Sequence, residues 1–207
     1  MIKRTAIRFA GLIALASSLT ACSLVPDSSS ASVQVAADTY VELPQPAALG
    51  YQVTASQLIS ATWHTEKGAN TQQLPVQLQV KNNQVVLAGF SSWGTRILSL
   101  DYQNEQLNTQ VLNGLEGSLP QPEQVLFNLM ITLWPQSTWE APLNKVRWSM
   151  VDTKQTRTVY NQQGKKVITV RYGADKPLDG DILFHNELLD YSIKIQTLNY
   201  QTHNEQP

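Results

Sequence analysis

Residues 74–90 decide the fold class of this chain. They read Leu74-Pro-Val-Gln-Leu-Gln-Val-Lys81, then Asn82-Asn83, then Gln84-Val-Val-Leu-Ala-Gly-Phe90. In the first half, apolar residues at every second position alternate mainly with polar ones, which is the period of a strand with one buried face. The Asn-Asn pair is typical of a tight hairpin turn, because Asn tolerates positive φ. Single-faced strands joined by short turns predict an antiparallel meander.

The same pattern extends along most of the chain. Alternation begins at 51–63, and further strand segments are expected at 95–102, 107–112, 145–151, 156–161, 167–172, 181–185 and 191–200. Short turn sequences, such as Asn104-Glu105 and 162–165, separate several of them. About ten strands of this kind in one chain predict a single, strongly curved antiparallel sheet.

One segment breaks the alternation. Residues 122–134 begin at Pro122 and contain only Asn128 and Thr132 as polar residues from Val125 onward. A Pro at the start, an acid in the first turn and a Pro just after the end favour a helix. A helix that is apolar nearly all round must be buried on most sides. The expected fold is therefore mainly β with α, a curved half-barrel with the helix as its lid.

Composition excludes several classes of protein. The 207 residues carry 15 basic and 16 acidic side chains, a formal net charge of −1, so the basic excess of a nucleic-acid binder is absent. A single cysteine excludes a disulfide framework, and three scattered histidines offer no metal-ligand spacing. We expect no metal and no cofactor.

The N-terminal segment has the features of an export signal. Lys3, Arg4 and Arg8 precede the apolar run 9–19, which is too short to span a bilayer of ~30 Å. Four regions follow: a signal peptide at 1–21, a Ser/Ala-rich tether at 22–39, the domain at 40–201 and a polar, disordered tail at 202–207.

The end of the signal, Leu19-Thr-Ala-Cys22, resembles the lipobox of bacterial lipoproteins. That resemblance implies that Cys22 is acylated and anchors the mature chain. Ser23, in place of an aspartate, implies the outer membrane, with the domain on the periplasmic face. The alternative is an ordinary signal peptide with a chance cysteine.

The order of these features resembles a known family. A meander, the loop Phe90-Ser-Ser-Trp-Gly94, and an apolar helix ending in Leu133-Trp-Pro135 are similar to the outer-membrane lipoprotein receptor LolB and the LolA-like fold. More closely, the chain resembles the DUF3261 group of lipoproteins. The resemblance implies a lipid or acylated cargo, and it makes a periplasmic LolA-like carrier a candidate partner.

Two candidate sites follow. A cavity between helix and sheet is expected to be lined by Leu126, Leu129, Met130, Leu133, Val76, Leu78, Trp148 and Ile193. Its alternative is a plain, fully packed core helix. Trp93, between small residues in a short loop, is expected to protrude and enter the membrane interface. Its alternative is a side chain folded back on the sheet.

Catalysis is not expected. His64 or His185 with Asp181 or Asp190 and one of many serines would make a Ser/His/Asp set, but no Gly-x-Ser-x-Gly elbow accompanies them. The prediction is an outer-membrane-anchored periplasmic lipoprotein, not an enzyme, that binds a lipid or lipidated cargo and delivers it to the membrane. The alternative is a non-catalytic envelope scaffold without a ligand. An envelope hydrolase is the third class.

Overall fold

The computed structural model describes residues 31–66, 68–115 and 121–203. The expected signal peptide, Cys22, the first half of the tether and the last residues of the tail lie outside them. Its elements in chain order are β1 (Ser32–Ala36), β2 (Thr39–Glu42), the short 3-10 turn η1 (Pro46–Leu49), β3 (Gln52–Thr65), β4 (Gly68–Lys81), β5 (Gln84–Phe90), β6 (Arg96–Gln103), β7 (Gln106–Val111), α1 (Pro122–Leu133), α2 (Gln136–Lys145), β8 (Ser149–Asp152), β9 (Thr156–Tyr160), β10 (Lys166–Tyr172), η2 (Pro177–Asp179), β11 (Ile182–Asn186) and β12 (Tyr191–His203).

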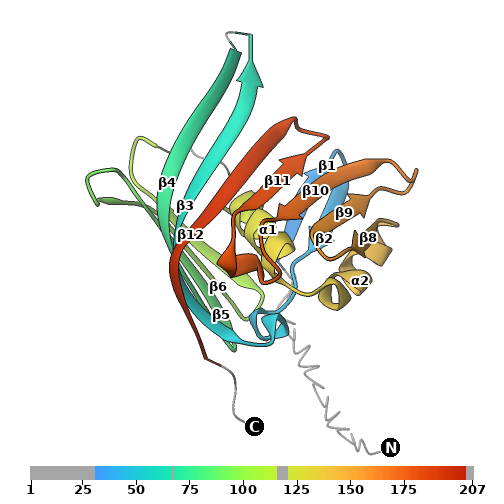
Figure 1. Cartoon of the computed structure of the whole chain (residues 1–207), viewed down its shortest axis with the longest axis horizontal. Coiled ribbons are helices and arrows are strands. Elements are labelled where there is room, and N and C mark those ends of the chain that lie inside the picture. Colours follow the sequence, from blue (N-terminus) through green and yellow to red (C-terminus); the bar gives the residue numbers. More distant parts are fainter. Residues whose placement is uncertain (1–30, 67, 116–120, 204–207) are drawn as a thin grey trace, which may run out of the picture.

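Ten of the strands form one open antiparallel sheet. Its order is β7-β6-β5-β4-β3-β12-β11-β10-β9-β8, so the last strand of the chain joins the two halves. Figure 1 shows the sheet curving around α1 without closing on itself. This confirms the expected fold class: mainly β, about ten antiparallel strands, and a central helix.

The hairpins form where the alternation predicts them, although one turn differs in detail. Asn104 and Glu105 both have positive φ, 51° and 61°, in the turn between β6 and β7. The Asn82-Asn83 turn also forms, but neither residue is among those with positive φ. That turn therefore uses ordinary backbone conformations, and the tolerance of Asn for positive φ is not needed there.

The β3–β4 hairpin is longer than the alternation indicates. β3 and β4 pair with each other from Val53↔Val80 to Thr65↔Gly68. β5 joins β4 only from Val76 onward, and β12 joins β3 only as far as Trp63. The end of this hairpin therefore extends beyond its neighbours, as Figure 1 shows at the top of the molecule.

Helix α1 is buried on almost every side. Eight of its twelve residues, Leu126 to Leu133, are buried, including Asn128 and Thr132. At its C-terminal end, the buried Arg157 of β9 donates through Nη1 to the carbonyls of Ile131 (2.6 Å) and Trp134 (2.8 Å). The same guanidinium pairs with both carboxylate oxygens of Asp152. Arg157 thus satisfies helix-end carbonyls that lack partners within the helix.

The structure differs from the expectations in three segments. Residues 145–151 were expected to form one strand, but α2 occupies 136–145 and β8 begins only at Ser149, after Arg147 with φ of 59°. β1 lies inside the segment expected to be a tether. Val33 and Val35 of this strand are buried, and the strand packs against α1. β12 continues to His203, into the segment expected as the tail.

Within the described residues, no helix has both the length and the apolar character needed to cross a bilayer.

Candidate functional site

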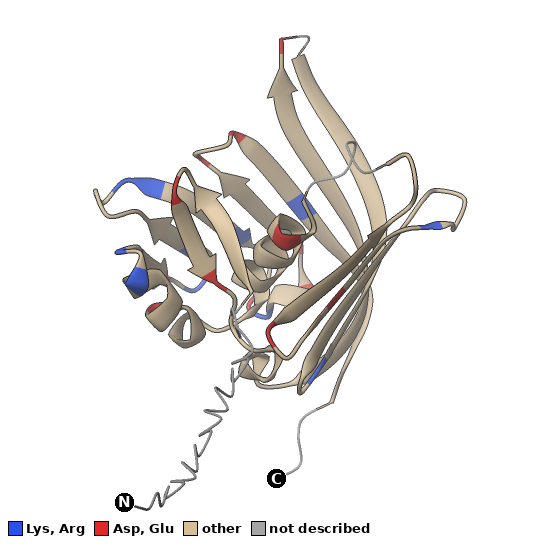
Figure 2. Ribbon diagram, turned by 180° about the vertical axis from the view of Figure 1, so that it is seen from behind, with Lys and Arg blue, Asp and Glu red and all other residues tan. Residues whose placement is uncertain are grey.

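A cavity of about 560 Å³ lies between α1 and the inner face of the sheet. Its walls come from β3, β4, β5, β6 and β12, from α1, and from the turn before β12. Fourteen of the residues are apolar: Ile59, Ala61, Trp63, Leu74, Val76, Leu87, Ile97, Leu98, Val125, Leu129, Leu189, Tyr191, Ile193 and Ile195. The other four are Gln72, Gln73, Gln124 and Asn128, so none of the lining residues is charged. Much of the surrounding sheet is free of Lys, Arg, Asp and Glu as well (Figure 2).

The pairing of β12 with β3 determines which residues follow one another along the long wall of the cavity. Residues on one face of a strand recur every second position, about 6.6 Å apart. Tyr191 pairs with Trp63 at the upper end of the cavity, which is the end nearer the turn between β3 and β4. The pairs Ile193↔Ala61 and Ile195↔Ile59 follow in turn below it. Below them Gln57, 1% exposed, donates to Thr197 over 3.2 Å. The cavity therefore extends along the strands from the aromatic pair Tyr191 and Trp63 towards the polar pair Gln57 and Thr197, which lies just below it.

A polar cluster interrupts the apolar wall near the upper end. Asn128 Oδ1 accepts hydrogen bonds from Gln124 Nε2 and from the Tyr191 hydroxyl, each at 3.1 Å. Burial raises the pKa of the Tyr191 hydroxyl, which is the donor in its bond to Asn128. The bond joins α1 to β12 across the cavity wall. No sequence pattern marks these residues as a site, although Asn128 is one of only two polar residues in 125–134.

Only some of the residues expected to line the cavity do so. Leu129, Val76 and Ile193 line it. The others are buried in the surrounding core and are not lining residues: Leu126, Met130, Leu133, Leu78 and Trp148. The part of α1 that faces the cavity is Gln124, Val125, Asn128 and Leu129, not the stripe at 126, 129, 130 and 133. Because α1 is covered on several sides, its apolar pattern does not distinguish the cavity face from the core face.

The upper end of the sheet exposes apolar side chains. Trp93 is 93% exposed in the β5–β6 turn. The positive φ of Gly94 (79°) and the hydrogen bond from Ser91 N to Thr95 O define that turn. The alternative of a Trp folded back on the sheet is therefore wrong. Leu189, 57% exposed, lies in the β11–β12 turn and also lines the cavity. Antiparallel pairing brings both turns to the same end as Trp63 and Tyr191.

Buried Asn186 shapes the β11–β12 turn. Its Oδ1 accepts from the backbone N–H groups of Leu188 and Leu189, at 2.9 and 3.0 Å. Such side-chain bonds to the backbone two and three residues on stabilise a tight turn. Asn186 thereby places Leu189 at the cavity.

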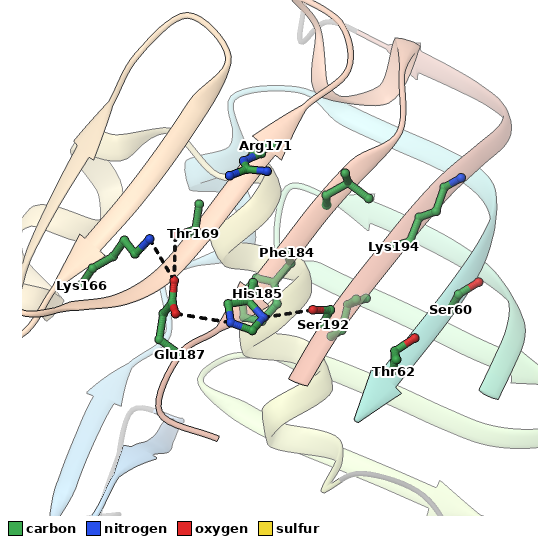
Figure 3. A pocket seen from close by; sticks show the side chains of 12 residues that line it. Ser60, Thr62, Lys166, Thr169, Arg171, Phe184, His185, Glu187, Ser192 and Lys194 are labelled. Carbon is green, nitrogen blue, oxygen red and sulfur yellow. Dashed lines mark hydrogen bonds and ion pairs between the residues drawn. The ribbon is translucent and has the colours of Figure 1, made fainter. Parts of the chain in front are cut away.

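A second, polar pocket of about 510 Å³ lies on the opposite face of the sheet, across β10, β11, β12 and β3 (Figure 3). Here His185 Nδ1 lies 3.0 Å from Ser192 Oγ, and His185 Nε2 lies 3.4 Å from Glu187. Lys166 also pairs with Glu187, at 3.0 Å. His185 and Ser192 are direct register partners, so strand pairing by itself accounts for their contact.

The other residues considered for catalysis do not join this group. His64 lies 3.5 Å from Asp190, and both side chains are largely exposed. Asp181 pairs with Lys194 at 2.8 Å. In the part of the chain that the structure describes, no cluster of three or more His, Cys, Asp or Glu residues could hold a metal ion.

Comparison with solved structures finds proteins of similar architecture at low sequence identity. A LolA superfamily protein from Nitrosomonas europaea matches with a TM-score of 0.42 and 10% identity, over 78% of this chain and 92% of that one. A candidate outer membrane lipoprotein-sorting protein domain from Vibrio parahaemolyticus matches with a TM-score of 0.35 and 9% identity, over 77% and 88% of the two chains.

Comparison with curated proteins finds no match. The family model described as "Protein of unknown function (DUF3261)" matches residues 54–199, from β3 to β12. That match covers most of the chain and all of the ten-stranded sheet apart from strand ends. The chain therefore belongs to the DUF3261 family.

Proposed function

We propose that this protein is an envelope lipoprotein that binds the hydrocarbon chain of a lipid or of a lipidated cargo and delivers it to a membrane. The observation that carries the proposal is the uncharged, largely apolar cavity between α1 and the inner face of the sheet. Its volume lies within the range of about 300–1,000 Å³ that is usual for small-molecule sites. A charged ligand group would find no counter-charge among the lining residues, whereas a hydrocarbon chain would find apolar contacts along most of the wall.

The energetics favour a chain rather than a compact ligand. Each methylene transferred from water into an apolar site contributes about 0.8 kcal/mol, before the cost of ordering the chain. The successive pairs from Tyr191 and Trp63 down to Ile195 and Ile59 offer such contacts over four residue steps along the strand, roughly 13 Å. A ligand that lies along these pairs gains apolar contact with each added methylene.

Delivery requires the mouth of the cavity to reach a membrane. Trp93 and Leu189 are exposed apolar side chains at the end of the sheet where the cavity begins. Trp favours the headgroup level of a bilayer because its ring is amphipathic. We infer that this end contacts the membrane, so that the hydrocarbon chain leaves the cavity without crossing bulk water.

Anchoring and location are parts of the same proposal. Cys22 would carry the acyl chains, and Ser23 favours the outer membrane with the domain in the periplasm. A LolA-like periplasmic carrier is a candidate donor of cargo. The second candidate, an envelope scaffold without a ligand, requires the cavity to stay empty, and no residue in the described part favours it specifically.

Filling the cavity tests the proposal. Ala61 lines the cavity in the middle of β3, so Ala61→Phe should occupy the space and lower the affinity for a fluorescent fatty-acid probe by at least about tenfold, or about 1.4 kcal/mol. Ala88→Phe is the matched control, because Ala88 lies on β5 between the inward, buried Leu87 and Gly89 and so faces outward. If both variants bind the probe as wild type does, the cavity is not the binding site.

A further inference from the structure

The amide nitrogen of Asn128 has no acceptor in the described protein. Asn128 is 7% exposed, and its Oδ1 already accepts from both Gln124 and Tyr191. Both neighbours donate to the Asn128 oxygen, so the amide nitrogen is the end of this side chain that remains for another partner. The Nδ2 group, with two N–H donors, makes no hydrogen bond to any residue that the structure describes.

This donor is not sealed in the core. Among described residues, two side-chain atoms are fully buried without a partner, Gln57 Oε1 and Trp139 Nε1, and Asn128 Nδ2 is not one of them. Asn128 itself lines the cavity. A polar donor in an apolar space is costly unless an acceptor meets it. Once a hydrocarbon chain has displaced water from the cavity, the ligand itself must supply that acceptor.

The position of Asn128 fits a particular part of a ligand. Its partner Tyr191 belongs to the upper pair with Trp63, while Ile193 and Ile195 continue the wall downward. A molecule with its tail along Ile193 and Ile195 would therefore present its head end to Asn128. In acyl lipids, the group that joins head and tail is a carbonyl.

We propose that Asn128 is a specificity-determining residue that donates from Nδ2 to the carbonyl oxygen of an acyl ligand, with the hydrocarbon tail below it. The ligand class is then an acyl ester, amide or fatty acid, and not a plain hydrocarbon or an isoprenoid without a carbonyl. Tyr191 is a positioning residue, since its hydroxyl holds the Asn128 oxygen and so aims the nitrogen into the cavity. This inference rests on the proposed function, because it presupposes that a hydrocarbon chain enters this cavity.

The test compares two probes of similar length, methyl laurate, which has an ester carbonyl, and tridecane, which has none. Each competes with a fluorescent fatty-acid probe for the full-length protein. Wild type should bind the ester more tightly. Asn128→Leu should weaken ester binding by about 2- to 10-fold, as the loss of one hydrogen bond predicts, and leave tridecane binding unchanged or tighter.

Two further variants separate recognition from stability. Tyr191→Phe keeps the ring and should reduce the preference for the ester by a smaller factor than Asn128→Leu does. Thr132→Val is the control, because Thr132 is also a buried polar residue of α1 but bonds to the carbonyl of Leu129. It should leave the ester-to-alkane ratio as in wild type.

The outcomes distinguish the two claims. The role of Asn128 is overturned if wild type binds the ester and the alkane with equal affinity, or if folded Asn128→Leu and Tyr191→Phe keep the wild-type preference for the ester. Either result leaves the proposed lipid-binding function of the cavity standing. Failure of both probes to compete in wild type overturns the cavity proposal and this inference with it.

Discussion

Trp63 and Tyr191 are register partners, one on β3 and one on β12, and both line the upper end of the cavity. Their strands are far apart in the sequence, and β12 joins the two halves of the sheet through this pairing. The aromatic pair therefore lies at the seam of the sheet, beside the rim where Leu189 is exposed. The position of the cavity mouth at this rim thus depends on the pairing of β12, the last strand of the chain, with β3.

Trp93 should matter for membrane contact and not for stability. Because its side chain is almost fully exposed, Trp93→Ala and Trp93→Glu should change the free energy of unfolding by no more than about 0.5 kcal/mol. Both should reduce co-flotation with liposomes, and Glu should reduce it further because a charge resists entry into the apolar zone. Wild-type flotation of Trp93→Glu would exclude an insertion role for this residue.

Arg157 should be a strong determinant of stability. Arg157 is 5% exposed, and its guanidinium pairs with Asp152 and donates to two carbonyls at the end of α1. Arg157→Met leaves those carbonyls and a partly buried carboxylate without a partner, so we expect a loss of about 3–5 kcal/mol in chemical denaturation. Arg157→Lys should restore only part of it, because Lys lacks the planar fork. A loss below about 1 kcal/mol for Arg157→Met would contradict this role.

Glu187 should contribute to stability in a pH-dependent way. The hydrogen bond from Lys166 holds the pKa of Glu187 below its ordinary value of 4.5. A carboxyl with a lowered pKa in the folded state stabilises the fold above the unfolded value, and this contribution disappears as the pH falls through the lower, folded value. Wild type should therefore lose more stability on acidification than Glu187→Gln does.

The control for Glu187 is Glu140→Gln, which changes an exposed acid of α2 that has no ion pair among the described residues. Thermal melts of the three proteins at neutral pH and below pH 4.5 provide the comparison. Identical pH profiles for wild type and Glu187→Gln would show that the ion pair does not contribute.

Cys22 should determine membrane attachment. If its thiol carries the acyl chains, Cys22→Ala removes the anchor, and the variant should accumulate unprocessed or appear in the periplasmic fraction. Cell fractionation with metabolic labelling by palmitate measures both effects. Continued outer-membrane fractionation of an unlabelled Cys22→Ala protein would contradict the anchor.

The sequence predicts the hairpins well because their signals are local. Alternation in 74–90 and the Asn104-Glu105 turn act within a few residues, and strands form there. β1 was missed, although Val33 and Val35 alternate with polar residues, because the surrounding segment is rich in Ser and Ala. The start of β8 was misplaced because Lys145-Val-Arg-Trp148 alternates polar and apolar residues as a strand does, although Lys145 is the last residue of α2.

The site was predicted only in outline. Leu129, Val76 and Ile193 line the cavity as expected, but a helix that is apolar all round gives no signal of which face meets the empty space. The polar cluster joins Asn128 to Tyr191, and such a long-range contact depends on the path of β12 through the sheet. Residue spacing within α1 carries no information about that path.

Native mass spectrometry of the protein as purified from cells shows whether the cavity holds an acyl lipid. Wild type and Ala88→Phe should carry an extra mass that corresponds to an acyl lipid, and Ala61→Phe, with its cavity filled, should not. The lipid should be released on denaturation and should contain a carbonyl-linked hydrocarbon chain. Two results would contradict lipid binding in this cavity. One is wild-type protein that stays free of lipid even after incubation with envelope lipid extract. The other is an equal amount of bound lipid in wild type and Ala61→Phe.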